Sequence, residues 1–346
     1  MIGVDVGYVS KAKKEKLMKI AVDIGYSSVK GVSEHDRVMF PSVVAPASED
    51  LLAGVVKSNI AHRVHLRRTL VDVEEHLVGD AAVMSALATS CLALREKPDA
   101  VHDILLLTAA YLLSPKEQAM AQMDLAIGLP ISYYRSQRPE LIKRLNGYSA
   151  WISVNDGRDM CLQICTISVF PQGSGALISS LKSLNNGLVA LLDIGSYTTD
   201  YLVFDVRHGQ PVPIPECCGS IEAGVSLVTR ALADEFQRQT GAPLPSRMYE
   251  SVLERVLAGE SVIFKGRPVE QLGKALAVAR GQVGNLIASN VTASLRDRAG
   301  FVVQTLIGGG GALLFKNEMI RAFPCSQIVD DPVFANAKGF LDMMPV

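Results

Sequence analysis

The sequence has almost no surplus of charge and no long hydrophobic run. Its 346 residues include 34 basic and 35 acidic side chains, for a formal net charge of −1. This balance gives no global reason to expect binding to nucleic acid or to an anionic membrane. The longest apolar stretch, about residues 104–113, is shorter than the ~20 residues that span a bilayer. The N-terminal charges are not followed by a long apolar run, so no signal peptide is apparent and we expect a cytoplasmic protein.

Common metal-binding and nucleotide-binding patterns are also missing. The six cysteines include no CxxC pair and no Cys/His cluster with zinc spacing, which predicts buried or edge thiols. No GxxxxGKS or GxxxxGKT stretch is present, which excludes a P-loop. The glycine run Gly308–Gly311 lacks the spacing, and the following acidic residue, of a Rossmann dinucleotide-binding turn.

What the sequence does contain is one short phrase that occurs twice, an apolar strand that ends in Asp-x-Gly and is followed by small hydroxyl residues. The first copy spans residues 19–28 around Asp23, and the second spans residues 188–200 around Asp193. Each copy continues into a further apolar run, so each is typical of strand–turn–strand. Glycine in the turn lets backbone N–H groups approach an anion, and the aspartate can hold a hydrated divalent cation. The two copies predict a duplicated clamp around a metal-bound polyphosphate.

A third, partial copy of the phrase lies near the N-terminus, around Asp5. Only the copy at Asp23 carries a lysine seven residues later, Lys30, and only that copy runs into a second strand. A charged stretch typical of a solvated tail follows the upstream copy. We therefore expect the fold to begin at Met18 and residues 1–17 to be a flexible extension.

Strand and helix patterns alternate in both halves of the chain, which predicts an α/β fold with two sheet cores. No low-complexity linker separates the halves, so we expect them to be tightly joined with a cleft between them. The predicted divisions are domain I at 18–187 with a small inserted subdomain at about 37–100, domain II at 188–331, and a C-terminal helix at 332–346 that packs back on domain I.

Local patterns give the elements of these domains. Helices are predicted over residues 81–94, 101–113, 138–145, 176–184, 224–240, 248–257, 269–295 and 334–343. A hairpin is predicted over residues 69–80, with its turn near Glu74 and Glu75. The basic cluster at 62–68 is interpreted as a solvated face.

Two further features lie at the ends of predicted strands. Gly308–Gly311 follows a buried strand, and four glycines favour either close approach of a nucleotide's adenosine or simply a tight turn. Gln172 could orient water for in-line attack on a γ-phosphate, as a glutamine does in small GTPases. By itself the triplet Pro171-Gln172-Gly173 is also explained by a plain turn, so the local pattern leaves both interpretations open.

Together these motifs resemble those of the actin, sugar-kinase and heat-shock-chaperone ATPase superfamily. Asp23 to Lys30 resembles its phosphate-1 motif, Asp193 to Asp200 its phosphate-2 motif, and Gly308–Gly311 its adenosine motif. The sequence is most similar to the ParM/StbA plasmid-segregation actins and their archaeal actin-like relatives. Supporting stretches are Phe40-Pro41-Ser42, Gly128-Leu129-Pro130, Pro171-Gln172-Gly173 and residues 334–340. The likeness covers residues 18–346 and implies an actin-like, ribonuclease H-like duplicated two-domain fold with a nucleotide cleft between the halves.

The resemblance also implies roles for individual residues. Gln172 would position the attacking water, Asp193 would accept a proton, and Asp23 and Asp193 would hold Mg²⁺ through water. The nucleotide would be ATP, with GTP as the alternative. The residues that would contact it are Gly25, Tyr26, Ser27, Ser28, Lys30, Gly195, Ser196, Tyr197, Thr198, Thr199, Glu222, Gly224, Gly308, Gly309, Gly310 and Gly311.

For the whole chain, the resemblance implies an actin-like ATPase whose nucleotide-dependent filaments drive plasmid DNA segregation. The expected partners are further copies of the chain and a ParR-like DNA-binding adaptor, without direct contact to nucleic acid or membrane. The alternative is a non-polymerising small-molecule kinase or phosphatase of the same superfamily. Such an enzyme usually needs its own catalytic aspartate in a substrate pocket, and the sequence offers no candidate beyond the clamp.

Overall fold

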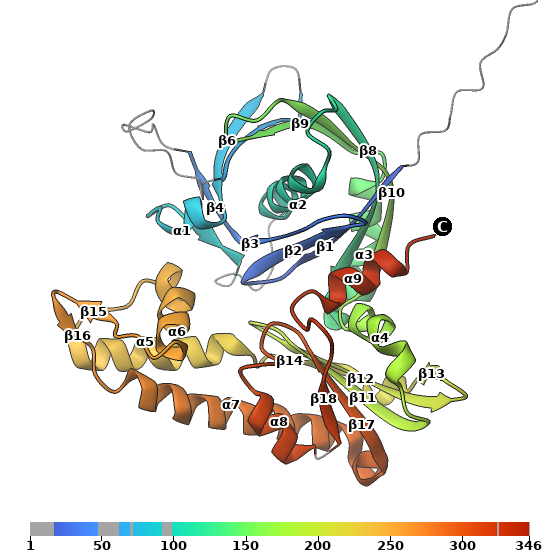
Figure 1. Cartoon of the computed structure of the whole chain (residues 1–346), viewed down its shortest axis with the longest axis vertical. Helices are drawn as coiled ribbons and strands as arrows, with labels where there is room; N and C mark the ends of the chain where they lie inside the picture. The colour runs from blue at the N-terminus through green and yellow to red at the C-terminus, as the bar shows by residue number, and fades with distance from the viewer. Residues whose placement is uncertain (1–16, 48–61, 70–71, 92–98, 324, 346) are drawn as a thin grey trace, which may run out of the picture.

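The computed structural model describes residues 17–47, 62–69, 72–91, 99–323 and 325–345. These residues form two main sheets, with helices α4 (Ser174–Ser180) and α9 (Ala335–Asp342) between them (Figure 1). The predicted extension lies outside the described residues except for Leu17, and so does the upstream copy around Asp5.

The two sheets repeat one five-strand arrangement. Its strands are β1 (Met18–Ile24), β2 (Ser28–Ser33), β3 (Arg37–Pro41), β8 (Met120–Leu129), β10 (Met160–Pro171), β11 (Gly187–Ile194), β12 (Thr199–Arg207), β13 (Gln210–Pro213), β17 (Val302–Gly308) and β18 (Ser326–Ile328). The order is β3-β2-β1-β8-β10 in the first sheet and β13-β12-β11-β17-β18 in the second. In both sheets the first three strands pair antiparallel and the rest pair parallel. The predicted α/β fold with a duplicated core is therefore present.

The first sheet continues beyond β10 and curves around a helix. The additional strands are β9 (Ser149–Val154), β5 (His62–Arg67), β6 (Val73–Val78), β4 (Val43–Pro46) and β7 (Thr89–Ser90). This curved sheet surrounds α2 (Asp99–Leu113) (Figure 1), which is buried nearly all round, including Leu105, Leu106 and Leu107. A helix that is apolar on every side is stable only inside a core. The strands of the segment 37–100 thus belong to the first sheet.

The second sheet is covered on both faces. Helices α5 (Val225–Thr240), α7 (Leu272–Leu295) and α8 (Lys316–Ala322) pack on one face, and α4 packs on the other. Helix α6 (Tyr249–Leu257) packs against α5 and α7. The remaining elements are α3 (Ile131–Leu145), which packs on β8 and β10, the short strand β14 (Gly219–Ile221), which pairs with β12, and the hairpin of β15 (Ile263–Phe264) and β16 (Arg267–Pro268).

Two local predictions before α2 are wrong. Glu74 and Glu75 do not form a turn, because they lie inside β6, which pairs with β5 along its length. The predicted helix at 81–94 is reduced among its described residues to α1 (Asp80–Val83), and β7 follows it. In both places the pairing with strands distant in sequence outweighs local propensity.

The basic cluster at 62–68 is also more than a solvated face. It forms β5, in which Val64 and Leu66 are fully buried and Arg63, His65 and Arg67 stay partly exposed. The alternation places these three basic side chains on one face and the two apolar ones in the core. The other predicted helices are present, with α3 beginning earlier than expected.

Helix α9 packs on the first sheet through Ala337 and Phe340, which join Ala21 and Ala126 in one apolar cluster. Its N-terminal end contacts α4 and thereby reaches the second sheet. Within the described part of the chain, every helix is too short or too polar to cross a membrane.

Candidate functional site

The two Asp-x-Gly hairpins present matching positions at the same place in each sheet. Asp23 lies across from Lys30 in the β1–β2 pair, and Asp193 lies across from Asp200 in the β11–β12 pair. All four residues line a single hollow between the sheets. The two copies of the sequence phrase therefore face each other in space.

The two turns are closed by the same hydrogen bond. The Gly25 N–H donates to the Ser28 carbonyl at 3.1 Å, and the Gly195 N–H donates to the Thr198 carbonyl at 2.8 Å. A Cβ atom on either glycine would come within 2.9 Å of that carbonyl oxygen. The absence of a side chain at these two positions is therefore a requirement of the turn itself.

We define the central hollow by the residues that line it. They are Asp23, Gly25, Tyr26, Lys30, Gln172, Asp193, Gly195, Ser196, Thr198, Asp200, Gly309, Gly310, Val333 and Asn336. All but Asp200, Val333 and Asn336 are site residues predicted from the sequence. Both turns, the glycine run and Gln172 thus meet at one place, although they are far apart in the sequence.

Gln172 contacts the first carboxylate directly. Its side-chain amide donates to Asp23 Oδ1 at 3.0 Å, and its backbone N–H donates to the Leu129 carbonyl at 2.8 Å. The next residue, Gly173, has a φ of +86°, a conformation that favours glycine. The triplet is a turn, and that turn directs the glutamine side chain to Asp23.

The glycine run is both a tight turn and part of the hollow. Gly309 has a φ of +85°, and a Cβ atom there would lie 2.6 Å from Asp193 Oδ1. Gly311 donates its N–H to the Ile194 carbonyl at 2.8 Å, which ties the run to the end of β11. Gly309 and Gly310 line the central hollow. Gly308 is the last residue of β17, and Gly311 makes the hydrogen bond to Ile194. The run is therefore a tight turn at Gly309, and Gly309 and Gly310 also contribute to the lining of the hollow.

Three further predicted contact residues lie next to the central hollow but do not line it. Tyr197 packs against Tyr26 across the two turns, with ring centroids 5.1 Å apart. The Ser27 hydroxyl hydrogen-bonds the carboxylate of Glu250 on α6, a side chain whose pKa is raised mainly by burial. Ser28 supplies the carbonyl that closes its own turn.

Three others have different contacts from those predicted. Thr199 is fully buried and donates its hydroxyl to the Ala223 carbonyl at 2.8 Å, so its side chain is not available to a phosphate. Gly224 lies where a Cβ atom would be 2.4 Å from the Gly195 carbonyl oxygen, so it lets α5 approach the second turn. Glu222 is exposed and lies outside the residues that line the hollow.

Asp200 and Asn336 line the central hollow without a role predicted for either from the sequence. Asn336 lies on α9 and donates from Nδ2 to Asp193 Oδ2 at 2.6 Å. Its segment contributes to the family resemblance, but no spacing within the sequence links it to Asp193. Asp200 did carry a signal, because it follows Asp193 by the same seven residues that separate Lys30 from Asp23.

Burial and neighbouring charges shift the acidities in the central hollow. Burial and the charge of Asp23 raise the pKa of Asp193 to about 6, against the lowering effect of Asn336 and Lys30. Burial and the charge of Asp193 raise the pKa of Asp200 to about 7. A divalent cation would favour the charged forms of such carboxylates. One or two carboxylates, completed by water and phosphate oxygens, are the usual protein ligands of Mg²⁺, so the residues present fit that ion.

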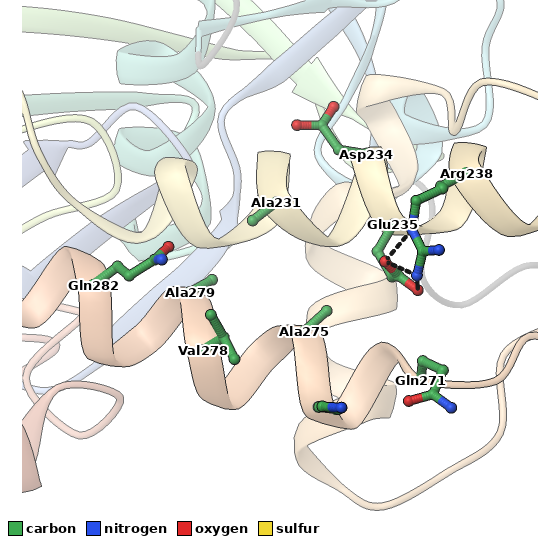
Figure 2. Close-up of a pocket in the computed structure, with 10 residues that line it drawn as sticks. Ala231, Asp234, Glu235, Arg238, Gln271, Ala275, Val278, Ala279 and Gln282 are labelled. Carbon is green, nitrogen blue, oxygen red and sulfur yellow. Dashed lines mark hydrogen bonds and ion pairs between the residues drawn. The ribbon is translucent and has the colours of Figure 1, made fainter.

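A second hollow, shown in Figure 2, lies between α5 and α7. It is lined by Ala231, Asp234, Glu235, Arg238, Gln271, Lys274, Ala275, Val278, Ala279 and Gln282. Arg238 donates to both carboxylate oxygens of Glu235 on the same helix, at 2.9 and 2.6 Å. This lining shares no residue with the central hollow, and none of the predicted site residues belongs to it.

Comparisons with known proteins agree with this geometry. Residues 21–175 match the family "Actin like proteins N terminal domain", and residues 191–321 match "Archaeal actin homologue MreB-like, C-terminal". No curated protein sequence matches the chain.

Solved structures of similar proteins cover nearly the whole chain. The pCBH ParM non-polymerisable quadruple mutant is 26% identical, with a TM-score of 0.82, and the match covers 94% of this chain and 98% of that one. A 15-stranded ParM filament from Clostridium botulinum is 25% identical, with a TM-score of 0.84 and the same coverage. The archaeal actin homologue Ta0583 in complex with ADP is 21% identical over the same shares of the two chains, has a TM-score of 0.74 and shows the same fold.

These matches confirm the predicted resemblance and the actin-like two-domain fold. They include both halves of the chain, and with them both Asp-x-Gly hairpins. The chain therefore belongs to the actin-like proteins, in the group that contains ParM and the archaeal actin homologues.

Proposed function

We propose that this protein binds ATP with Mg²⁺ in the central hollow, hydrolyses the ATP, and forms filaments whose turnover depends on that hydrolysis. One observation carries the proposal: two equivalent hairpins present Asp23 and Asp193 to one hollow, together with Gln172 and the glycines Gly309 and Gly310. A nucleotide bound by both hairpins would connect the two sheets.

In this proposal different groups of the chain bind the phosphates, the adenosine and the Mg²⁺ ion. Backbone N–H groups and hydroxyls of the two turns, with the ammonium group of Lys30, bind the phosphates from opposite sides. Gly309 and Gly310 lie against the adenosine. Asp23 and Asp193 hold Mg²⁺ through water, and the bound ion would neutralise charge on the phosphates.

Hydrolysis needs an oriented water and a proton acceptor. Gln172 already donates to Asp23, so its amide lies at the metal-binding side of the hollow, where it would orient the attacking water. Asp193 accepts the proton, because its carboxylate lines the same hollow as Gln172. We take residues 18–187 and 188–331 as the two domains that close on the nucleotide, with 332–346 packed on the first.

The filament and its use are proposed from the relatives. A similar ParM structure is a filament, so the partners here would be further copies of this chain. If the chain is plasmid-borne, a ParR-like DNA-binding adaptor would connect the filament to DNA, and the work would be plasmid segregation in the cytoplasm. The kinase or phosphatase alternative has no observation of its own, because every carboxylate among the described residues that line the central hollow belongs to one of the two hairpins.

The test combines phosphate release with electron microscopy of the purified full chain. With ATP and Mg²⁺ we expect phosphate release, increased light scattering and filaments in negative stain, all lost when EDTA removes the metal. A parallel arm with GTP measures nucleotide preference. Nucleotide hydrolysis that leaves the protein monomeric at all concentrations would overturn the filament part, and an absence of nucleotide binding would overturn the whole proposal.

A further inference from the structure

Asn336 connects the two halves of the central hollow through three hydrogen bonds. Its Oδ1 accepts from the backbone N–H groups of Gly173, at 3.0 Å, and Ala176, at 3.4 Å. Its Nδ2 donates to Asp193 Oδ2 at 2.6 Å. Because a backbone N–H can only donate, these partners fix which end of the amide faces the carboxylate.

The backbone that carries Asn336 has little freedom to move. Helices α4 and α9 cross where Gly175 meets Gly339, and a Cβ atom on Gly339 would lie 2.0 Å from the Gly175 carbonyl oxygen. A Cβ atom on Gly175 would lie 2.2 Å from the Asn336 carbonyl oxygen. Asn336 as a residue is only 5% exposed. The amide is therefore held in place by packing as well as by its partners.

The same contacts connect Asp193 to the residue proposed to orient water. Gly173, which donates to Asn336, directly follows Gln172, and Gln172 donates to Asp23. A continuous chain of hydrogen bonds and one peptide link thus runs from one carboxylate to the other. With Oδ2 engaged by Asn336, the second oxygen of Asp193 remains on the side of Gly309.

We propose that Asn336 is a positioning residue: it fixes the orientation of the Asp193 carboxylate and couples it to the turn that carries Gln172. This inference rests on the proposed nucleotide hydrolysis. A small displacement of a catalytic group costs much of its contribution, so the loss of this donor should lower the rate of hydrolysis more than nucleotide affinity.

The isosteric change Asn336→Asp replaces the amide donor by a carboxyl group. It keeps an oxygen for the Gly173 and Ala176 N–H groups, but as a carboxylate it cannot donate to Asp193 and places a second negative charge beside it. Asn336→Ala removes both functions. Ser179→Ala is the matched control, because Ser179 donates to the Gly175 and Ala335 carbonyls at the same helix junction.

The first readouts are kcat, KM and the ADP dissociation constant without Mg²⁺. For Asn336→Asp we expect kcat to fall by at least about tenfold and the metal-free ADP dissociation constant to change less than about threefold. Ser179→Ala should match the wild type. Wild-type kcat in a folded Asn336→Ala protein would overturn the inference, and equal losses of rate and metal-free affinity in Asn336→Asp would do the same.

A crystal structure of Asn336→Ala provides a test that does not depend on activity. We expect the Asp193 side chain to leave its wild-type rotamer while the two sheets stay in place. An unmoved Asp193 would overturn the inference even if the wild-type chain hydrolyses nucleotide. If the wild-type chain does not hydrolyse nucleotide, the proposed function is overturned. The position of Asp193 in the Asn336→Ala crystal structure would still decide whether Asn336 orients it.

Discussion

Lys30 and Asp200 occupy the same position in the two hairpins, each on the second strand and directly across from the aspartate that is the last but one residue of the first strand. The first hairpin therefore pairs a carboxylate with an ammonium group, whereas the second pairs two carboxylates. The duplicated arrangement carries opposite charges at equivalent places, and the surplus of buried negative charge lies on the second hairpin. This asymmetry predicts how stability depends on pH.

We expect Asp200→Asn to stabilise the metal-free, nucleotide-free protein at pH 8 and to do so much less at pH 4.5. The folded-state pKa of about 7 exceeds the ordinary value of 3.8. The folded state therefore binds more protons than the unfolded state between these values, and stability falls as pH rises through this window. Removal of the ionised group should contribute about 1–3 kcal/mol at pH 8. Urea unfolding at both pH values measures the difference, and a variant that is less stable than the wild type at pH 8 would contradict this expectation.

Asp193→Ala should abolish Mg²⁺-dependent hydrolysis while the protein stays folded. The side chain lies at the end of β11 beside the second turn, where a metal-positioning carboxylate contributes several kcal/mol to the transition state by the proposed mechanism. Phosphate release and circular dichroism measure the two properties. Asp205→Ala, on the same hairpin but outside the hollow, is the control. Wild-type turnover in a folded Asp193→Ala protein would refute the assignment.

Gln172→Ala should slow hydrolysis much more than it weakens nucleotide binding. Water orientation acts in the transition state, whereas ground-state affinity comes from the two turns and the glycine run. Filaments, if they form, should persist longer, because hydrolysis would destabilise them. Single-turnover rates and nucleotide titrations separate the two effects, with Gln122→Ala as an exposed control. Equal losses of rate and affinity would indicate that Gln172 is structural.

A protein that begins at Met18 should bind nucleotide and assemble like the full chain. Strand β1 has a partner strand on each edge. It pairs antiparallel with β2, in the register that places Asp23 across from Lys30, and parallel with β8. We therefore do not expect the copy of the phrase around Asp5 to replace β1 there. Nucleotide affinity and light scattering of the shortened protein check this. If Asp5→Ala proves as damaging as Asp23→Ala, the copy around Asp23 is not the functional one.

Two glycine-to-alanine changes should have opposite effects on stability. Gly339→Ala places a Cβ atom 2.0 Å from the Gly175 carbonyl oxygen, so α4 and α9 must separate, which should cost roughly 1–3 kcal/mol or more. Gly281→Ala, inside α7 with nothing within 4 Å of the new atom, should instead stabilise by about 0.5–1 kcal/mol. Thermal and urea unfolding measure both. A neutral Gly339→Ala variant would mean that the helix crossing adjusts freely.

Features that depend on neighbours in the chain could be predicted from the sequence. The repeated phrase around Asp23 and Asp193 predicted both hairpins, since a strand, a glycine turn and a second strand all lie within a few residues. Helical patterns predicted α5, α6 and α7 for the same reason. The family resemblance added Gln172 and the glycine run, which local patterns left open. Most of the central hollow therefore came from contiguous motifs.

Tertiary structure alone decided the features whose partners are distant in sequence. Glu74 and Glu75 lie in a strand because β5 and β4 border β6 on both sides. Thr199 bonds the Ala223 carbonyl instead of facing the hollow, because β12 is covered there by the segment that leads into α5. Asn336 meets Asp193 only because Gly175 and Gly339 let two helices cross in backbone contact. The sequence by itself determined the local shapes and their chemistry, since short-range sterics and periodicity act within each segment. The packing of the two sheets against their shared helices determined which of these segments contact one another. No local pattern in the sequence specifies that packing.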